Sequence, residues 1–145
     1  MKSDQSIKNI VVASIRRYAM DMETWVSTRL WDEGDQILKQ ELTSTCHTAV
    51  DELPILYSYI DQSNWTLVTT RRIWHSSGGR VGSVAASEVV GHQSGNFKGY
   101  GEQASEVMII SACDGEIHRC PFETGKPSMG TIYAVRTLCN LARAA

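Results

Sequence analysis

The sequence predicts an α+β fold with N-terminal helices, antiparallel strands that form an open barrel or a strongly bent sheet, and a C-terminal helix that caps it. Three observations support this prediction: helical spacing of apolar residues in 1–53, short alternating segments with glycine turns in 55–122, and one amphipathic segment in 127–145. A chain of 145 residues is long enough to bury a core without disulfides. We expect these three parts to form one domain over residues 1–145.

Two helices are predicted before the strands. The first begins at about Ser6, a residue type that often caps helices, and continues to the region of Trp25. The second runs from about residue 35 to residue 50, after Gly34, and ends before Pro54 because the residue preceding a proline avoids helical backbone angles. Apolar residues recur every three or four positions in both: Ile7, Ile10, Val11, Ile15, Tyr18, Met22, Trp25 and Val26, then Ile37, Leu38, Leu42, Cys46 and Val50.

The middle of the chain changes to the two-residue alternation typical of strands. Asp114-Gly115 favours a tight turn and gives the clearest hairpin. The fourth strand is expected to bend at Gly91 or Gly95. In order, the predicted strands are 55–60, 65–74, 81–84, 87–90, 107–112 and 116–122.

The final helix follows Gly125-Lys126-Pro127. Pro127 suits the first turn of a helix, where a missing backbone N–H leaves no hydrogen bond unmade. The apolar face of this helix is formed by Met129, Ile132, Tyr133, Val135, Leu138, Cys139 and Ala142.

Composition is that of an ordinary globular protein, with 42% apolar and 21% charged residues. Asp4, Arg16 and Arg17 interrupt the first twenty residues, and no stretch approaches the roughly 18 apolar residues that a membrane span needs. We therefore expect a cytoplasmic protein without a membrane span. We also expect its widely spaced cysteines to be free, buried thiols: Cys46, Cys113, Cys120 and Cys139.

Negative charge is concentrated in one part of the chain. Residues 21–52 contain eight acidic and two basic residues, whereas the whole chain has a net charge of only −2. This segment is either a solvated helix face or a surface that attracts a basic partner. For the second interpretation, the predicted partner-binding residues are Trp31, Asp32, Glu33 and Asp35, because three acids flank Gly34 beside an aromatic residue of a type enriched at binding hot spots.

No catalytic, nucleotide or metal motif is complete. Gly125-Lys126-Pro127-Ser128 lacks the earlier glycine of a phosphate-binding loop, and residues 91–95 (GHQSG) place the serine one position late for a nucleophile elbow. Cys113, His118 and Cys120 lack the close cysteine pair of a zinc site. We therefore expect no enzymatic activity, no cofactor and no bound metal.

Residues 67–74 read LVTTRRIW and are followed by a polar turn and a short apolar segment at 84–90. This arrangement resembles the bacterial pleckstrin-homology-like (PH-like, GRAM-like) domain. The resemblance covers about residues 55–141 and implies an open barrel capped by the final helix. Headgroup binding by such a domain needs several bases at the open end, where this chain offers Arg71, Arg72, Arg80 and Lys98. Arg71 and Arg72 are neighbours in one predicted strand and are expected to point to opposite faces.

These observations favour a non-enzymatic binding module. By fold-level analogy, the most concrete expectation is a bacterial immunity protein that neutralises a cognate toxin domain by covering it, and the acidic segment suits a basic toxin such as a nuclease. The alternative is a PH-like adaptor that binds lipid headgroups or peptides, and an enzyme of unrecognised type comes third. We expect no nucleic-acid partner, because such a protein usually has a basic stripe. The oligomeric state stays open.

Overall fold

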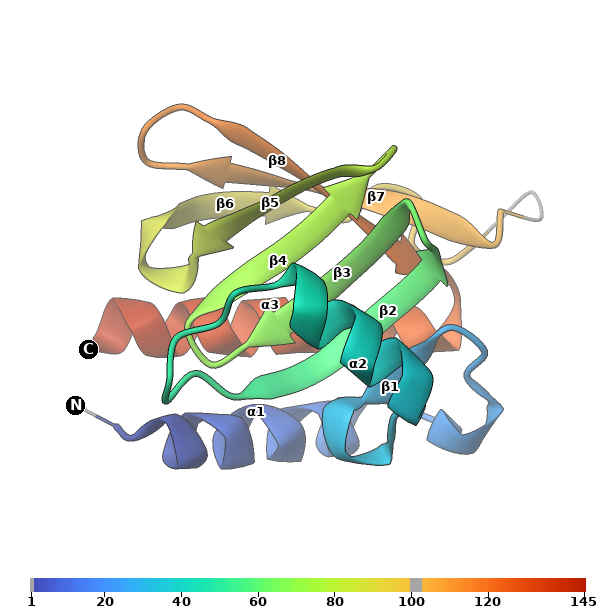
Figure 1. Cartoon of the computed structure of the whole chain (residues 1–145), viewed down its shortest axis with the longest axis horizontal. Helices are drawn as coiled ribbons and strands as arrows, with labels where there is room; N and C mark the ends of the chain where they lie inside the picture. The colour runs from blue at the N-terminus through green and yellow to red at the C-terminus, as the bar shows by residue number, and fades with distance from the viewer. Residues whose placement is uncertain (1, 100–102) are drawn as a thin grey trace.

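Helices and antiparallel sheets make up the fold, as the α+β prediction requires. The computed structural model describes residues 2–99 and 103–145. Within these ranges, three α-helices accompany two antiparallel sheets (Figure 1). The helices are α1 (Asp4–Tyr18), α2 (Gln36–Thr45) and α3 (Lys126–Ala144). None of the described helices is long and apolar enough to cross a membrane.

The strands divide between two open sheets and do not form one strongly bent sheet in the described part of the chain. The larger sheet contains, in spatial order, β1 (Thr28–Leu30), β2 (Pro54–Asp61), β3 (Asn64–Thr69), β4 (Arg72–Ser77) and β5 (Arg80–Ala85). The smaller sheet contains β6 (Val89–Gln93), β7 (Ser105–Ala112) and β8 (Ile117–Glu123).

The central strands of the larger sheet, β2, β3 and β4, are buried on both faces. Leu56, Val68, Ile73 and Val84 lie opposite one another on successive strands and belong to the main core. On the other face, Tyr57, Leu67 and Trp74 form a second cluster with Leu42 and Cys46 from α2 and the loop that follows it. In Figure 1, α2 crosses one face of the sheet while α3 lies behind the other.

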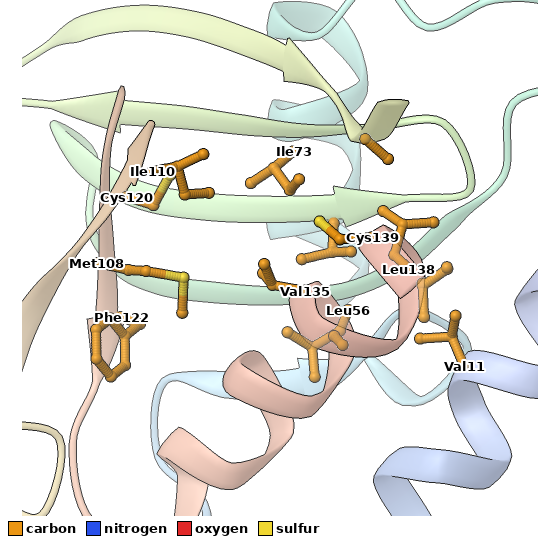
Figure 2. Packing of buried hydrophobic residues seen from close by; sticks show 14 of the residues in the cluster. Val11, Leu56, Ile73, Met108, Ile110, Cys120, Phe122, Val135, Leu138 and Cys139 are labelled. Atoms are coloured by element: carbon orange, nitrogen blue, oxygen red, sulfur yellow. The ribbon is translucent and has the colours of Figure 1, made fainter. Parts of the chain in front are cut away.

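The main core fills the space between the larger sheet, the smaller sheet and α3 (Figure 2). Every side chain labelled in that view is at least nine-tenths buried. The smaller sheet contributes Met108, Ile110, Cys120 and Phe122, while Val135, Leu138 and Cys139 come from α3. The expected apolar face of the last helix is therefore confirmed at these three positions.

A row of small or polar residues crosses the face of the larger sheet that is turned toward the main core, with one residue from each strand. The pairing register places these residues directly opposite one another, and we call them the polar row: Thr28, Ser58, Thr66, His75 and Gly82. The four with side chains are all buried. Thr28 and Ser58 share a hydrogen bond of 2.9 Å within the row, and the other buried polar groups need partners from another element.

Strand β8 supplies those partners as it passes over β2, β3 and β4. Its Glu123 carboxylate accepts a hydrogen bond of 2.8 Å from the Thr28 hydroxyl, and its Glu123 N–H donates one of 2.9 Å to Ser58 Oγ. The Thr66 hydroxyl donates to the Pro121 carbonyl at 2.6 Å. His75 and His118 are joined at 2.9 Å. The polar row thus fixes how the two sheets cross.

The first helix ends earlier than predicted. Helix α1 stops at Tyr18, and Asp21, whose φ of 50° is left-handed, begins a single 3₁₀ turn. Trp25 is buried because its ring packs where Gly130 leaves room: a Cβ there would lie 2.7 Å from the indole. Val26 is instead exposed. Apolar residues keep the helical spacing beyond Tyr18 although the chain there is not an α-helix. A strand that was not predicted, β1, follows.

Two other expectations are corrected. The predicted strand 65–74 is broken at Thr70 and Arg71, where the Thr69 hydroxyl accepts from the N–H groups of Arg71 and Arg72 and closes a turn without glycine or proline. Helix α2 ends at Thr45, so Val50 is 98% exposed, and Ile37 also faces solvent.

The expectation of free, buried cysteines is confirmed for three of the four. Cys46, Cys120 and Cys139 are free and buried, but Cys113 is exposed, because it lies in the β7–β8 turn.

Candidate functional site

Trp31 stands at the junction predicted to bind a partner. It opens a short 3₁₀ turn, η2 (Trp31–Glu33), between β1 and α2. Its indole meets the Tyr57 ring edge-on, with centroids 6.4 Å apart, and the Lys39 ammonium lies 5.4 Å from the indole centre. Both contacts restrict the ring, which is half-buried at the edge of the second cluster.

The turn between η2 and α2 is fixed by Tyr57. The Asp35 N–H donates a 2.9 Å hydrogen bond to the Tyr57 hydroxyl. Gly34 passes so close to this ring that a Cβ would lie 2.6 Å from Tyr57 Cε2. Glycine is therefore required here by the close approach, although its backbone angles are ordinary.

The three predicted acids are all engaged by other groups. Asp32 forms an ion pair with Lys8 at 2.9 Å and Glu33 one with Arg16 at 3.1 Å, and both cations come from α1. The Asp35 carboxylate caps α2 by accepting from the Leu38 N–H. Asp32 and Glu33 still expose 71% and 54% of their side chains. Asp35 is also exposed, but its carboxylate is occupied by the helix cap.

A hollow of about 420 Å³ opens beside Trp31. Sequence reasoning found only its tryptophan. The other lining residues recur on one face of α2 at steps of three and four. Helical spacing would have identified them if the contact between Trp31 and that helix had been known. We call this site the Trp31 hollow, lined by Trp31, Gln36, Lys39, Gln40, Thr43 and Ser44.

Glu52, also in the acidic segment, is buried and structural. Its carboxylate accepts hydrogen bonds from the Ala49 N–H, the Thr69 hydroxyl and the Trp74 indole, and pairs with Arg72 at 3.0 Å. Burial acts to raise the pKa of this carboxyl, but the hydrogen bonds and the Arg72 charge together lower it below the ordinary value. Glu52 therefore ties the loop after α2 to β3 and β4.

His75 and His118 lie within hydrogen-bonding distance, as the members of a catalytic dyad do, but their position is that of a structural contact. His75 belongs to the polar row and is only 8% exposed. Burial, and then the nearby charge of His118, lower the pKa of His75 to about 4. Among the residues that the structure describes, no group of three or more His, Cys, Asp or Glu side chains is placed to hold a metal ion. Cys113 in particular lies in an exposed turn, whereas Cys120 is in the core.

Two of the arginines considered for headgroup binding, Arg71 and Arg72, are engaged by other groups. Arg71 pairs with Asp4 through two hydrogen bonds at the mouth of a cavity of about 530 Å³ between the start of α1 and the end of α3. Arg72 binds Glu52 and lies over the Trp74 ring. The two guanidinium groups have separate partners on separate elements, so they do not form one anion site.

No protein-family model, curated protein or solved structure matches the chain. The roles of the residues above therefore rest on their geometry and chemistry.

Proposed function

We propose that this protein is a non-enzymatic binding module that captures a protein partner at the Trp31 hollow. The observation that carries the proposal is the position of Trp31, a constrained indole that lines a hollow with polar residues of α2 and is followed in the same turn by two surface carboxylates. Tryptophan contributes more than most residues to protein interfaces, above all where a ring of polar contacts excludes water. The hollow is the place where a partner side chain would meet that indole.

The indole is prepared for binding before a partner arrives. Tyr57 and Lys39 already hold the ring, so little side-chain freedom is lost on association. The Gly34–Tyr57 contact and the Asp35 cap likewise fix the backbone on its C-terminal side. A rigid anchor of this kind lowers the free-energy cost of association.

Charge favours a basic partner. Asp32 and Glu33 extend from η2 into solvent, where a lysine or arginine of a partner competes with Lys8 and Arg16 for their oxygens. Exposed ion pairs contribute little stability, about 0–1 kcal/mol, so exchanging one for another costs little. The gain lies chiefly in faster and more selective encounter.

The most concrete form of this proposal is an immunity protein that covers a basic toxin domain and has a PH-like arrangement of strands. Antiparallel strands followed by one C-terminal helix are compatible with that arrangement. The link from architecture to immunity is an analogy at the level of fold. The binding surface is argued from residues and stands independently of it.

The test is protection of growth. The proposal predicts a toxin gene directly beside this one, and the gene would be co-expressed with that toxin in wild-type form and as Trp31→Ala with Asp32→Asn and Glu33→Gln. We expect growth with the wild type and loss of protection with the triple variant. Asp114→Asn with Glu116→Gln, two exposed acids at the β7–β8 turn, is the matched control and should protect fully. Protection by the triple variant would refute the role of the Trp31 hollow.

A further inference from the structure

Helices α1 and α3 pack side by side as an antiparallel pair (Figure 1). The Ser14 and Thr137 hydroxyls join them at 2.8 Å. One turn further along each helix, the rings of Tyr18 and Tyr133 stack with centroids 4.5 Å apart and planes inclined by 11°. Tyr18 is 47% exposed, so this stack lies at the surface.

An arginine from the same helix lies over each ring. The Arg17 guanidinium carbon is 5.5 Å from the centre of Tyr18, and that of Arg136 is 5.9 Å from the centre of Tyr133. Because each tyrosine fills the inner face of the other, the guanidinium groups belong to the outer faces. We call this four-residue unit the arginine–tyrosine stack.

Some neighbouring cations have acidic partners, but these two arginines have none among the residues that the structure describes. Lys8, Arg16 and Lys126 each pair with a carboxylate, but within residues 2–99 and 103–145 no carboxylate lies within 4.0 Å of Arg17 or Arg136. Helix α3 contains no acidic residue at all. The only acid of α1, Asp4, lies at its far end and binds Arg71.

We propose that the arginine–tyrosine stack is a second docking surface, which binds an acidic segment of a protein through its Asp or Glu side chains. A guanidinium that lies over a ring without a carboxylate partner has N–H donors available for the two oxygens of an incoming carboxylate. Tyrosine and arginine are also among the residues that contribute most to protein interfaces. Charge complementarity comes from the unpaired arginines and the acid-free helix.

A protein fits this surface better than a nucleic acid does. Proteins that bind single strands stack bases on open aromatic faces, and here those faces are covered by a ring on one side and a guanidinium on the other. Glu33 also lies against Arg16, the residue before Arg17, so a long phosphate chain along α1 would meet a carboxylate. A short acidic segment avoids it.

The proposal is independent of the Trp31 hollow and is tested with a separate probe. The full-length ¹⁵N-labelled chain would be titrated with a decaglutamate peptide at low salt, followed by NMR. We expect chemical-shift changes centred on Arg17, Tyr18, Tyr133 and Arg136, and an affinity about three- to tenfold weaker for Arg17→Gln/Arg136→Gln, since each exposed charge pair contributes only a few-fold. The Trp31 hollow should be unaffected.

The matched control is Arg80→Gln/Arg119→Gln, which removes two exposed arginines from strands β5 and β8 and changes net charge equally. Equal weakening by this control would show unspecific charge attraction and overturn the proposal. Tighter binding of decauridylate than of decaglutamate would also overturn it, in favour of nucleic acid. Unchanged affinity in Arg17→Gln/Arg136→Gln, with native circular dichroism, would exclude the surface altogether.

Discussion

Nε2 of His75 and Nδ1 of His118 are 2.9 Å apart and share a hydrogen bond between strands of different sheets. One of the two rings must donate and the other accept, so the contact in this form requires at least one neutral imidazole. His75 is the ring at which a proton is least favoured, since it is buried beneath β8 and its pKa is lowered to about 4. The contact between the sheets therefore depends on pH.

Stability is expected to fall on mild acidification. An unfolded histidine has a pKa near 6.5, so between pH 6.5 and 4 the unfolded chain binds more protons than the folded one. The free energy of unfolding should be highest above pH 6.5 and decrease as the pH falls toward 4, by about 3 kcal/mol at most from this residue. Urea unfolding from pH 7.5 to 4 measures it. In His75→Gln, the decrease between pH 6.5 and 5 should be much smaller.

Gly82→Ala should destabilise the sheet crossing. A Cβ at this position would lie 2.9 Å from His75 Cε1 and would push the ring away from His118. We expect a loss of roughly 1–3 kcal/mol from overpacking, measured by thermal unfolding. Gly91→Ala is the control, because nothing lies within 4 Å of a Cβ there and its φ is not left-handed. Equal melting temperatures for the two variants would contradict the tight contact.

Glu52→Gln should cost about 3 kcal/mol or more, because it leaves the Arg72 charge without its buried carboxylate. The lowered pKa of Glu52 has a consequence for pH as well: its contribution is present above the unfolded value near 4.5 and is lost as the pH falls through the folded value. Denaturant unfolding at pH 7 and pH 3.5 would show a smaller difference between variant and wild type at the lower pH. Asp51→Asn, an exposed neighbour, should change little.

Trp31 and the acids beside it should affect binding in different ways. Trp31→Ala removes an anchor and should raise the dissociation rate, whereas Asp32→Asn/Glu33→Gln should slow association and weaken its salt dependence. Surface plasmon resonance against the purified partner at two salt concentrations separates the two effects. Association that stays equally fast and salt-sensitive would mean that the carboxylates are only solvated.

Asp35 is expected to affect stability and not binding, although the sequence pattern grouped it with Asp32 and Glu33. Asp35→Ala should cost about 1 kcal/mol of stability through loss of the α2 cap. It should leave the association rate close to that of the wild type.

One thiol should react in the native protein. Cys113 is exposed, whereas burial raises the pKa of Cys46 to about 12 and that of Cys139 to about 11 and raises that of Cys120 as well. Iodoacetamide at pH 8 should therefore modify Cys113 alone, and all four cysteines after unfolding in guanidinium, as peptide mass spectrometry would show. Rapid native modification of Cys120 would mean that the core opens.

Sequence patterns sufficed where local chemistry decides the structure. The β7–β8 hairpin follows from Asp114-Gly115, and Pro127 marked the start of α3. They failed where distant residues decide. The turn at Thr70 depends on the Thr69 hydroxyl, and β1 exists because it pairs with β2.

The residues of the candidate site could likewise be predicted only in part from the sequence. Trp31 stood out by residue type and position, but the partners of its neighbours could not be inferred. Lys8 and Arg16 lie 24 and 17 positions before the carboxylates they bind, and only packing of α1 beside η2 brings them together. The role of Asp35 could have been inferred from the sequence, since an aspartate directly before a helix often caps it.

The polar row also bears on errors during folding. The two sheets come from separate stretches of chain, 28–85 and 89–123, and each can form hairpins before they meet. In a misaligned encounter the Thr66 hydroxyl and the His75 imidazole would be buried without partners, at about 1–3 kcal/mol each. An apolar face alone would tolerate many such arrangements. Wrongly docked intermediates should therefore separate quickly, which keeps the exposed edges of unfinished sheets from persisting long enough to aggregate.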